Sequence, residues 1–384
     1  RALGAHPAWQ QPLPPLPVAP ERGAPARLAP GEPYAGLAQL RERLMALGDL
    51  PTQPLSEQRN ELPNEPRNEQ HSQLPSEPHS APLYDGALVA AVRAFQSRHG
   101  LTADGIIGRA TRAALEIPPA ARAQQIALTM ERLRWTPLQQ APRMVVINLP
   151  EFMLRAYEVD ERGQIRVRTT MKVIVGKALD TRTPVFVETM RAIEFSPYWN
   201  VPPSIARGET VPRLRRDPGY FVREGFEFVD GAGRSVTELT AAHLDAVLAG
   251  SMRLRQRPGP RNALGDIKFV FPNRDHIFLH HTPQTALFDR DRRDFSHGCI
   301  RVEQPLALAL FVLEGMPSWT EARVRQAMQA GSASTVALAR PLPVLITYGT
   351  ALVRQGRVHF FDDVYGHDRQ LAAQLARPRA PLPH

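Results

Sequence analysis

The sequence predicts an α+β protein, in which a small domain of three helices precedes a larger, mainly β domain. Two patterns predict this fold class: apolar residues recur at helical spacing between residues 34 and 116, and short β-type runs begin near residue 143. A third observation is the length of 384 residues with 43% hydrophobic content, which allows two or three domains with buried cores.

The N-terminal region combines a proline-rich segment with a first helix. Residues 1–33 are rich in Pro and Ala, which predicts a disordered, polyproline-like tether. Helical periodicity follows at 34–50, and Gly48 is a plausible stop signal. The apolar positions of this helix are Leu37, Leu40, Leu44 and Leu47. Residues 51–82 repeat short fragments of Asn, Glu and Pro, so we expect a low-complexity loop there.

Two further helices complete the small domain. Residues 85–99 carry an apolar face that consists of Leu88, Val89, Val92 and Phe95. An Asp104-Gly105 turn leads to a third helix at about 109–115. Pro118 and Pro119 mark the end of this helix.

The mainly β domain is predicted from runs of β-favouring residues that Gly, Pro and Asp separate. These runs are 144–149, 152–158, 165–175, 185–195, 267–271 and 276–281. A basic stretch at 200–262, with one helix near 237–249, interrupts them and is interpreted as an insertion. For the rest of the chain we expect helices at 303–315 and 318–330, a closing hairpin of 342–348 with 357–361, and a terminal helix at 368–376.

The chain is basic, with a formal net charge of +9 that is spread along its length. The simpler interpretation of this charge is that it keeps the protein soluble. The alternative is that it provides affinity for an anionic polymer such as nucleic acid, a membrane surface or the cell wall. No run of about 18 apolar residues is present, so we expect no membrane span in this chain. Because the chain begins at Arg1, we expect that a segment, either a signal peptide or an anchor, has been removed.

The single cysteine, Cys299, lies in a segment whose side chains are of types that take part in catalysis. Its neighbours are Ser296-His297-Gly298-Cys299-Ile300-Arg301-Val302, and a strand upstream ends in Leu279-His280-His281-Thr282-Pro283. A histidine within reach of a thiol can take its proton and give a thiolate–imidazolium pair, and a third group must hold the imidazole in one tautomer. We expect Cys299 to enter an apolar helix, whose macrodipole would favour the thiolate.

Residues around Cys299 also suit an acyl-transfer reaction. The N–H groups of Gly298 and Cys299 could face a developing oxyanion, and Arg301 could bind a substrate carboxylate through two hydrogen bonds. The choice of base stays open between His280 and His281, because successive strand residues point to opposite faces. His297 is a third candidate, although its position suits shaping the loop.

Two alternatives to a nucleophilic cysteine were weighed. A zinc site would have enough ligands, namely His276, His280, His281, His297 and Cys299. However, the sequence has no His-Glu-x-x-His helix and offers only one thiolate, so zinc is disfavoured. If Cys299 were an inert, buried residue, the occurrence of the Ser-His-Gly-Cys-Ile-Arg segment around it would be unexplained.

The combination of Ser-His-Gly-Cys-Ile-Arg with an upstream Leu-His-x-Thr-Pro strand resembles the L,D-transpeptidase (YkuD-type) catalytic domain. Further segments over about residues 120–378 look like the larger periplasmic branch of that family. They are Glu131-Arg132-Leu133-Arg134-Trp135, Val175-Gly176-Lys177, Arg182-Thr183-Pro184, 197–203, Asn262-Ala263-Leu264-Gly265 and Tyr348 with Tyr365-Gly366.

A second resemblance, over residues 35–116, is to the small three-helix peptidoglycan-binding domain. The matching residues are Tyr84-Asp85, Ala91-Val92, Phe95-Gln96, His99-Gly100-Leu101, Asp104-Gly105, Ile107-Gly108 and Thr111. Together the resemblances imply a tether at 1–33, a binding domain at 34–118 split by 51–82, and a β-sandwich catalytic domain at 119–340. They also imply a capping insertion at about 203–262 and a C-terminal strand and helix extension at 341–384.

The resemblance also implies roles for individual residues. Cys299 matches the acylated nucleophile, His280 the base, and the backbone carbonyl of His281 the group that orients the base. His281 stands where the family usually has Gly or Asp. Further matches are Gly298 beside the nucleophile, then Ser296, His297 and Arg301 in the signature loop, and Trp199 and Asn200 ahead of the capping insertion.

The implied reaction is a peptidoglycan cross-linking step in the periplasm. Cys299 would attack a tetrapeptide stem at its third residue, a diaminopimelate, release D-alanine and form a thioester, which a second stem would resolve into a 3→3 cross-link. No metal or organic cofactor is expected, nor is nucleic acid, and carbapenems would acylate Cys299. A carboxypeptidase or hydrolase of the same fold and a non-enzymatic wall-binding scaffold stay open as alternatives.

Overall fold

The computed structural model describes residues 6–18, 25–51, 82–137 and 141–377. The chain divides into two compact units. The first comprises Arg1–Glu131, Thr350–Asp362 and Leu371–His384, and the second comprises Arg132–Gly349 and Asp363–Gln370. Most of the predicted low-complexity loop, residues 52–81, lies outside the described residues.

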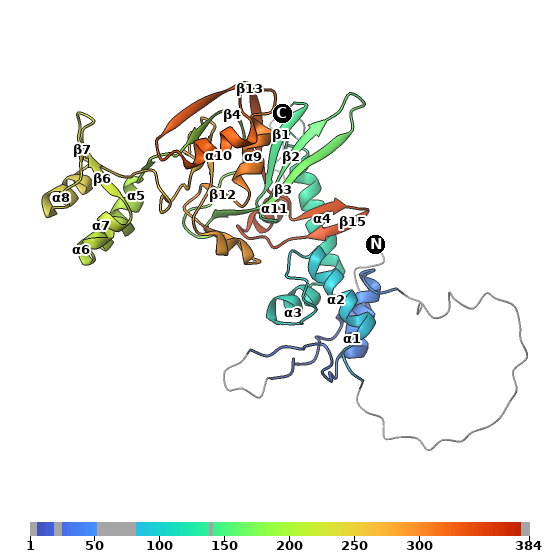
Figure 1. Ribbon diagram of the computed structural model, residues 1–384. Coiled ribbons are helices and arrows are strands. Elements are labelled where there is room, and N and C mark those ends of the chain that lie inside the picture. The colour runs from blue at the N-terminus through green and yellow to red at the C-terminus, as the bar shows by residue number, and fades with distance from the viewer. Residues whose placement is uncertain (1–5, 19–24, 52–81, 138–140, 378–384) are drawn as a thin grey trace, which may run out of the picture. The chain divides into compact units, whose positions relative to one another are not determined.

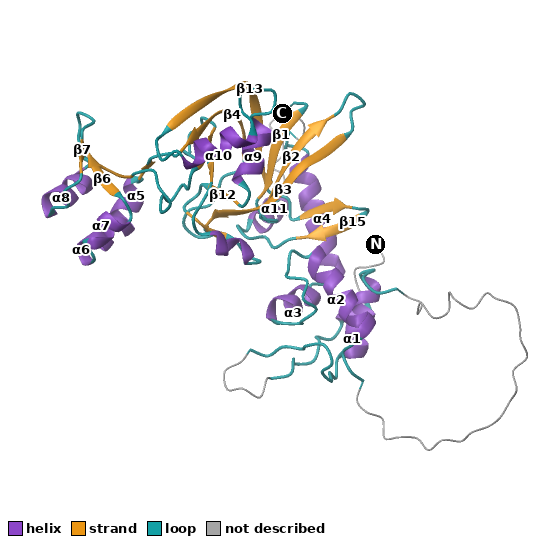
Figure 2. Cartoon of the chain, viewed as in Figure 1, coloured by secondary structure: helices purple, strands orange, loops and turns teal. Residues whose placement is uncertain are grey.

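The first unit is mainly helical (Figure 2). Its helices are η1 (Pro7–Trp9), α1 (Leu37–Ala46), α2 (Gly86–Arg98), α3 (Arg109–Glu116) and most of α4 (Pro119–Leu133). The three predicted helices are therefore confirmed, although α1 is shorter than the predicted 34–50. Their apolar faces meet in one core, whose fully buried members include Leu40, Leu44, Val92, Phe95 and Leu115.

The proline-rich segment ahead of α1 packs against this core. Three of its leucines are buried there, namely Leu13, Leu16 and Leu28. Arg43, which is fully buried in α1, donates hydrogen bonds to the backbone carbonyls of Ala8 and Gln11 at 2.9 and 2.7 Å. The expectation of a disordered tether is therefore wrong for residues 6–18 and 25–33. The leucines between the prolines supply apolar surface that a small core needs.

A hairpin near the C-terminus also belongs to the first unit. It consists of β14 (Ala351–Arg354) and β15 (Arg357–Phe360), which pair in antiparallel fashion. Gln355 and Gly356 form its two-residue turn, and both have positive φ angles, 52° and 73°, as a type I′ turn requires.

The predicted pairing of 342–348 with 357–361 is wrong, because residues 342–347 belong to β13 (Ser334–Thr347) in the second unit. There β13 lies between β1 and β4. Val344, Leu345 and Ile346 are all buried. A continuous buried run of this kind is typical of a strand covered on both faces rather than of a hairpin edge.

The second unit is built on a nine-stranded sheet (Figure 1). Its strands are β1 (Arg143–Asn148), β2 (Met153–Val159), β3 (Ile165–Gly176), β4 (Phe186–Phe195), β9 (Ile267–Val270), β10 (Leu279–His280), β11 (Asp294–Ser296), β12 (Ile300–Val302) and β13. They lie in the order β11-β3-β12-β10-β9-β4-β13-β1-β2, and β2 also pairs with β3, which links the last strand back into the sheet. The predicted β runs are confirmed as strands of this sheet, except that the run 276–281 forms a strand only at Leu279–His280.

One core packs against the nine-stranded sheet, and the two helices between β12 and β13 contribute to it. These helices are α9 (Pro305–Val312) and α10 (Glu321–Gln329), close to the predicted positions. Leu308, Ala309 and Val324 from them are fully buried against sheet residues such as Val145 and Leu279. The short helix η4 (Thr285–Asp289) and the first residues, up to Gln370, of helix α11 (His367–Leu375) complete the elements of this unit outside the insertion. The mainly β class of this domain is thereby confirmed.

The insertion folds into a subdomain with its own core. We call residues 199–256 the inserted subdomain. Its elements are β5 (Trp199–Asn200), α5 (Pro203–Ile205), the π-helical turn η3 (Ala206–Thr210), α6 (Val211–Arg216), α7 (Gly219–Arg223), β6 (Phe226–Val229), β7 (Ser235–Val236), α8 (Ala241–Ala249) and β8 (Arg253–Gln256). The strands form a sheet in the order β5-β8-β6-β7. Leu214, Phe221, Phe228 and Leu254 are buried at its centre.

Over the described ranges of the chain, no helix has both the length and the apolar character needed to cross a bilayer.

Candidate active site

The parallel pair β10 and β12 brings the predicted catalytic residues to one face of the sheet. In this pair Leu279 lies opposite Ile300 and His280 lies opposite Arg301. Leu279 and Ile300 are fully buried in the core. Because side chains alternate along a strand, His280 and Arg301 point to the other face. Cys299 directly precedes β12, and the charges of Arg301 and of Lys268, which pairs with His280 from strand β9, both act on its thiol.

The thiol of Cys299 is held in a partly enclosed position beside backbone groups. Its Sγ lies 3.7 Å from the carbonyl oxygen of His276. Burial raises the pKa of Cys299 to about 11, although the Phe278 N–H and the charges of Lys268 and Arg301 act in the opposite direction. In the free protein the sulfur is therefore a neutral thiol at neutral pH.

The expectation that Cys299 enters a helix is wrong. It is followed by the three-residue strand β12, and α9 begins only at Pro305. The alternation of Ile300, Arg301 and Val302 fits a half-buried strand, and Pro is favoured in the first turn of the helix that follows. The helix macrodipole therefore does not act on this thiol, which agrees with the direction of its pKa shift.

His280 is held by a backbone carbonyl, as the resemblance implied. Its Nδ1 lies 2.5 Å from the carbonyl oxygen of His281, so that Nδ1 must carry the hydrogen and Nε2 is the proton-accepting nitrogen. Burial lowers the pKa of His280 to about 3, with a further contribution from the charge of Arg301. The free protein therefore contains a neutral imidazole and a neutral thiol rather than the ion pair expected from sequence.

The side chain of His281 points to a different partner. Its Nδ1 forms a hydrogen bond with the side chain of Asp266 at 2.6 Å, and its ring lies so close to Gly265 that a side chain at that position would collide with it. The backbone N–H of His281 donates to the carbonyl of Ile267. The choice between the two histidines, which the residues alone left open, therefore favours His280 on geometric grounds.

A set of hydrogen bonds fixes the loop that carries Cys299. The hydroxyl of Ser296 donates to the carbonyl of Cys299 at 2.5 Å, and the N–H of Gly298 donates to the same hydroxyl at 3.2 Å. Gly298 has a φ of 115°, a conformation that favours glycine. Since the Gly298 N–H is already used, only the Cys299 N–H has no acceptor in the part of the chain that the structure describes. The predicted pair of oxyanion donors is thus reduced to one in the free protein.

Two residues outside the signature loop, Thr183 and Tyr365, support it directly and through Gly176, and no motif predicts this role for either. The hydroxyl of Thr183 donates to the carbonyl of Gly298 at 2.7 Å and accepts from the N–H of Gly176 at 2.9 Å. The hydroxyl of Tyr365 donates to the carbonyl of Gly176 at 2.7 Å. Both residues lie in segments of the family resemblance, but no spacing rule connects them to a loop more than 60 residues away from either.

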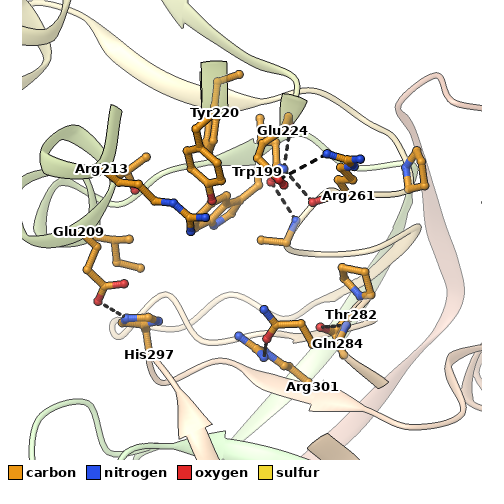
Figure 3. A pocket seen from close by; sticks show the side chains of 17 residues that line it. Trp199, Glu209, Arg213, Tyr220, Glu224, Arg261, Thr282, Gln284, His297 and Arg301 are labelled. Carbon is orange, nitrogen blue, oxygen red and sulfur yellow. Dashed lines mark hydrogen bonds and ion pairs between the residues drawn. The ribbon is translucent and has the colours of Figure 1, made fainter. Parts of the chain in front are cut away.

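A pocket of about 380 Å³ lies between the sheet and the inserted subdomain (Figure 3). Of the predicted site residues, Trp199, His297 and Arg301 line it, whereas Asn200 lines a different cavity because neighbouring residues of β5 point to opposite sides. His297 forms a hydrogen bond through Nε2 with Glu209 of the inserted subdomain at 2.6 Å. Arg301 donates to the side-chain carbonyl of Gln284 at 2.7 Å, and burial lowers its pKa.

The histidines that could have formed a zinc site have separate partners. His280 faces the His281 carbonyl, His281 faces Asp266 and His297 faces Glu209. Within the described ranges, no group of three or more His, Cys, Asp and Glu side chains converges as a metal site would require.

Family models match two parts of this chain. The model described as "L,D-transpeptidase catalytic domain" matches residues 142–320. The chain contains an L,D-transpeptidase catalytic domain. A second model, described as "Putative peptidoglycan binding domain", matches residues 79–115. Both resemblances found in the sequence are therefore confirmed, and the L,D-transpeptidase domain contains Cys299, His280 and the inserted subdomain.

Individual relatives agree with this family. A protein of Haemophilus influenzae named "Putative L,D-transpeptidase" is 30% identical over 248 residues, which cover 65% of this chain and 49% of the relative. This chain therefore spans about half the length of that relative. Solved structures of L,D-transpeptidases from Xylanimonas cellulosilytica (18% identity, 85% of this chain and 100% of that chain, TM-score 0.24) and Stackebrandtia nassauensis (13%, 70% and 79%, TM-score 0.26) are also similar.

The raised pKa of Cys299 predicts slow and pH-dependent alkylation by iodoacetamide, which reacts with the thiolate. With a pKa of about 11, the rate should rise about tenfold per pH unit between pH 7 and pH 9.5 without levelling off. Intact-protein mass spectrometry measures the rate, and Cys299→Ala, which removes the only thiol, is the blank. A plateau reached by pH 8 would show a thiolate and would contradict this description of the site.

Proposed function

We propose that this chain is a cysteine-dependent acyltransferase that forms 3→3 cross-links between peptidoglycan stems. The observation that carries the proposal is that His280 lies opposite Arg301 on two adjacent strands, Arg301 follows Cys299 by two residues, and His280 is held through Nδ1 by the His281 carbonyl. An imidazole fixed in one tautomer beside the only thiol of the chain suits acyl transfer through a thioester.

In the first half-reaction, Sγ of Cys299 attacks the carbonyl carbon of the third stem residue, and the thiol proton passes to Nε2 of His280. The resulting oxyanion accepts a hydrogen bond from the Cys299 N–H. When the tetrahedral intermediate collapses, the bond to the terminal D-alanine breaks. His280 returns the proton to the leaving amine, and a thioester remains on Cys299.

In the second half-reaction, the side-chain amine of another stem attacks the thioester carbonyl. His280 takes a proton from this amine and passes it to the departing sulfur, so that the free thiol is restored and a 3→3 amide bond is formed. No cofactor enters either step. Because Cys299 and His280 are both neutral in the free protein, charge develops only as the substrate reacts, beside the positive charges of Lys268 and Arg301.

The surroundings of the site support a cell-wall substrate. Arg301 lines the pocket and is a partner for a stem carboxylate. The peptidoglycan-binding domain would hold the chain on the wall that the catalytic domain modifies, and the periplasm is the compartment that this substrate implies. Carbapenems, which acylate thiols in such sites, would be covalent inhibitors.

Product analysis tests the proposal and separates it from its alternatives. Purified disaccharide-tetrapeptide is incubated with the protein and the products are weighed by mass spectrometry. Dimers lacking one D-alanine support the transpeptidase, and tripeptide alone would make the chain a carboxypeptidase. Cys299→Ala should abolish both products. If this variant leaves the product profile unchanged, the cysteine mechanism is wrong and the scaffold alternative stands.

A further inference from the structure

The pocket beside Arg301 is lined by three arginines and only two glutamates, which gives it an excess of positive charge. Its two carboxylates are both engaged, Glu209 with His297 at 2.6 Å and Glu224 with Arg261 at 3.7 Å. Two guanidinium groups remain, those of Arg213 and Arg301, and neither has a carboxylate within 4.0 Å among the residues that the structure describes. A pocket with an excess of positive charge and two guanidinium groups that no carboxylate contacts attracts an anionic ligand.

Arg301 supplies the wall of the pocket on the sheet side. Of its three guanidinium nitrogens, only Nη1 has an acceptor within the described residues, the side-chain oxygen of Gln284 at 2.7 Å. Its Nε is buried without any partner. A largely buried cation with unused donors is unfavourable until an acceptor arrives.

Arg213 supplies the opposite wall, from helix α6 of the inserted subdomain (Figure 3). Its Cζ lies 3.7 Å from the centre of the Tyr220 ring, so that the guanidinium is stacked on the aromatic face. Stacking fixes the plane of the group and leaves its edge N–H groups available for a planar acceptor such as a carboxylate. In the part of the chain that is described, the Arg213 side chain has no hydrogen-bond acceptor.

We propose that Arg213 and Arg301 form a two-point carboxylate site that selects donor stems in which both carboxylates are free rather than amidated. This inference rests on the proposed function. Arg301 lies two residues from Cys299, so it binds the carboxylate of the diaminopimelate that becomes acylated. Arg213 lies on the far wall and binds the α-carboxylate of the preceding, γ-linked glutamate. Amidation of that glutamate removes the charge that Arg213 recognises.

The test compares two synthetic tetrapeptide stems, one with a free and one with an amidated glutamate α-carboxylate. The full chain should prefer the free stem by about tenfold in kcat/KM, equal to about 1.4 kcal/mol. Arg213→Gln should lower kcat/KM on the free stem by this tenfold factor. On the amidated stem the same variant should change kcat/KM less than about twofold. Arg213→Lys, which keeps the charge, should restore part of the preference for the free stem. The matched control is Arg216→Gln on the same helix, because Arg216 donates to the Pro212 carbonyl and does not line the pocket.

The outcomes separate this inference from the proposed function. If the wild-type chain is active but shows no preference, or if Arg213→Gln loses activity equally on both stems, the two-point site is wrong and the transpeptidase proposal is untouched. If the wild-type chain makes no product, the proposed function fails. Calorimetric binding of both stems to Cys299→Ala then decides the inference: a preference that Arg213→Gln removes supports it, and equal affinities overturn it.

Discussion

Acylation of Cys299 by a carbapenem is expected to stop when His280 is replaced by Ala and only to slow when His281 is replaced by Ala. His280 lies opposite Arg301, two residues from Cys299, and in the proposed mechanism its loss removes the group that accepts the thiol proton, an effect of about 10²- to 10⁴-fold. With the pKa of Cys299 raised to about 11, hardly any thiolate is present at neutral pH to react without a base. His281→Ala keeps the backbone carbonyl that holds Nδ1 of His280, so a loss of less than about tenfold is expected.

The comparison of these two variants is well matched, since the residues are neighbours of the same type. His281→Ala leaves Asp266 without its partner, but the Asp266 side chain is 34% exposed and water can solvate it. The rate is read from the mass shift of the intact protein over time, and circular dichroism checks that both variants are folded. Equal losses in both variants would refute the assignment of His280 as the base.

Much of the site could be predicted from the sequence because its reactive residues lie in two short segments. The segment around Cys299 and the strand that ends at His280 were recognisable as a nucleophile and a base on their own residue types. The identity of the base was not, because alternation in a strand says that His280 and His281 point apart but not which one faces Cys299. That depends on the register of β10 against β12, which pairs His280 with Arg301.

The parts that sequence reasoning missed depend on long-range packing or on very short elements. Strand β12 has three residues, too few to show a period, so the apolar residues of α9 made the whole segment look helical. Thr183 and Tyr365 reach the Cys299 loop only through the fold of the sheet. Arg213 had no motif at all, since its role depends on the stacking partner Tyr220 and on the opposite wall of the pocket.

The hydrogen bonds that brace the Cys299 loop make Gly176 a position where Ala should be strongly destabilising. A methyl group on Gly176 would lie 1.9 Å from the carbonyl oxygen of Thr181 and 2.8 Å from the N–H nitrogen of Thr183. Both atoms are backbone, so the 181–183 turn must move. Thr183 then loses its bonds to Gly176 and Gly298, at about 1–3 kcal/mol for each buried group left unpaired. We expect Gly176→Ala to lower the Tm by about 10 °C, measured by thermal unfolding, and to lower the rate of Cys299 acylation about 100-fold or more.

Gly231→Ala is the control for the backbone, because Gly231 has an ordinary φ angle and nothing within 4 Å of the added methyl group. It should change the Tm by no more than about 2 °C. If Gly176→Ala does not fold, Thr183→Val tests the same brace with little change of volume: it should slow acylation, whereas Thr183→Ser, which keeps the hydroxyl, should not. Gly176→Ala tests the space beside Gly176, whereas Thr183→Val tests the hydrogen bonds of the Thr183 hydroxyl. A fast Thr183→Val variant would mean that the loop holds Cys299 in position without the bond from Thr183 to the Gly298 carbonyl.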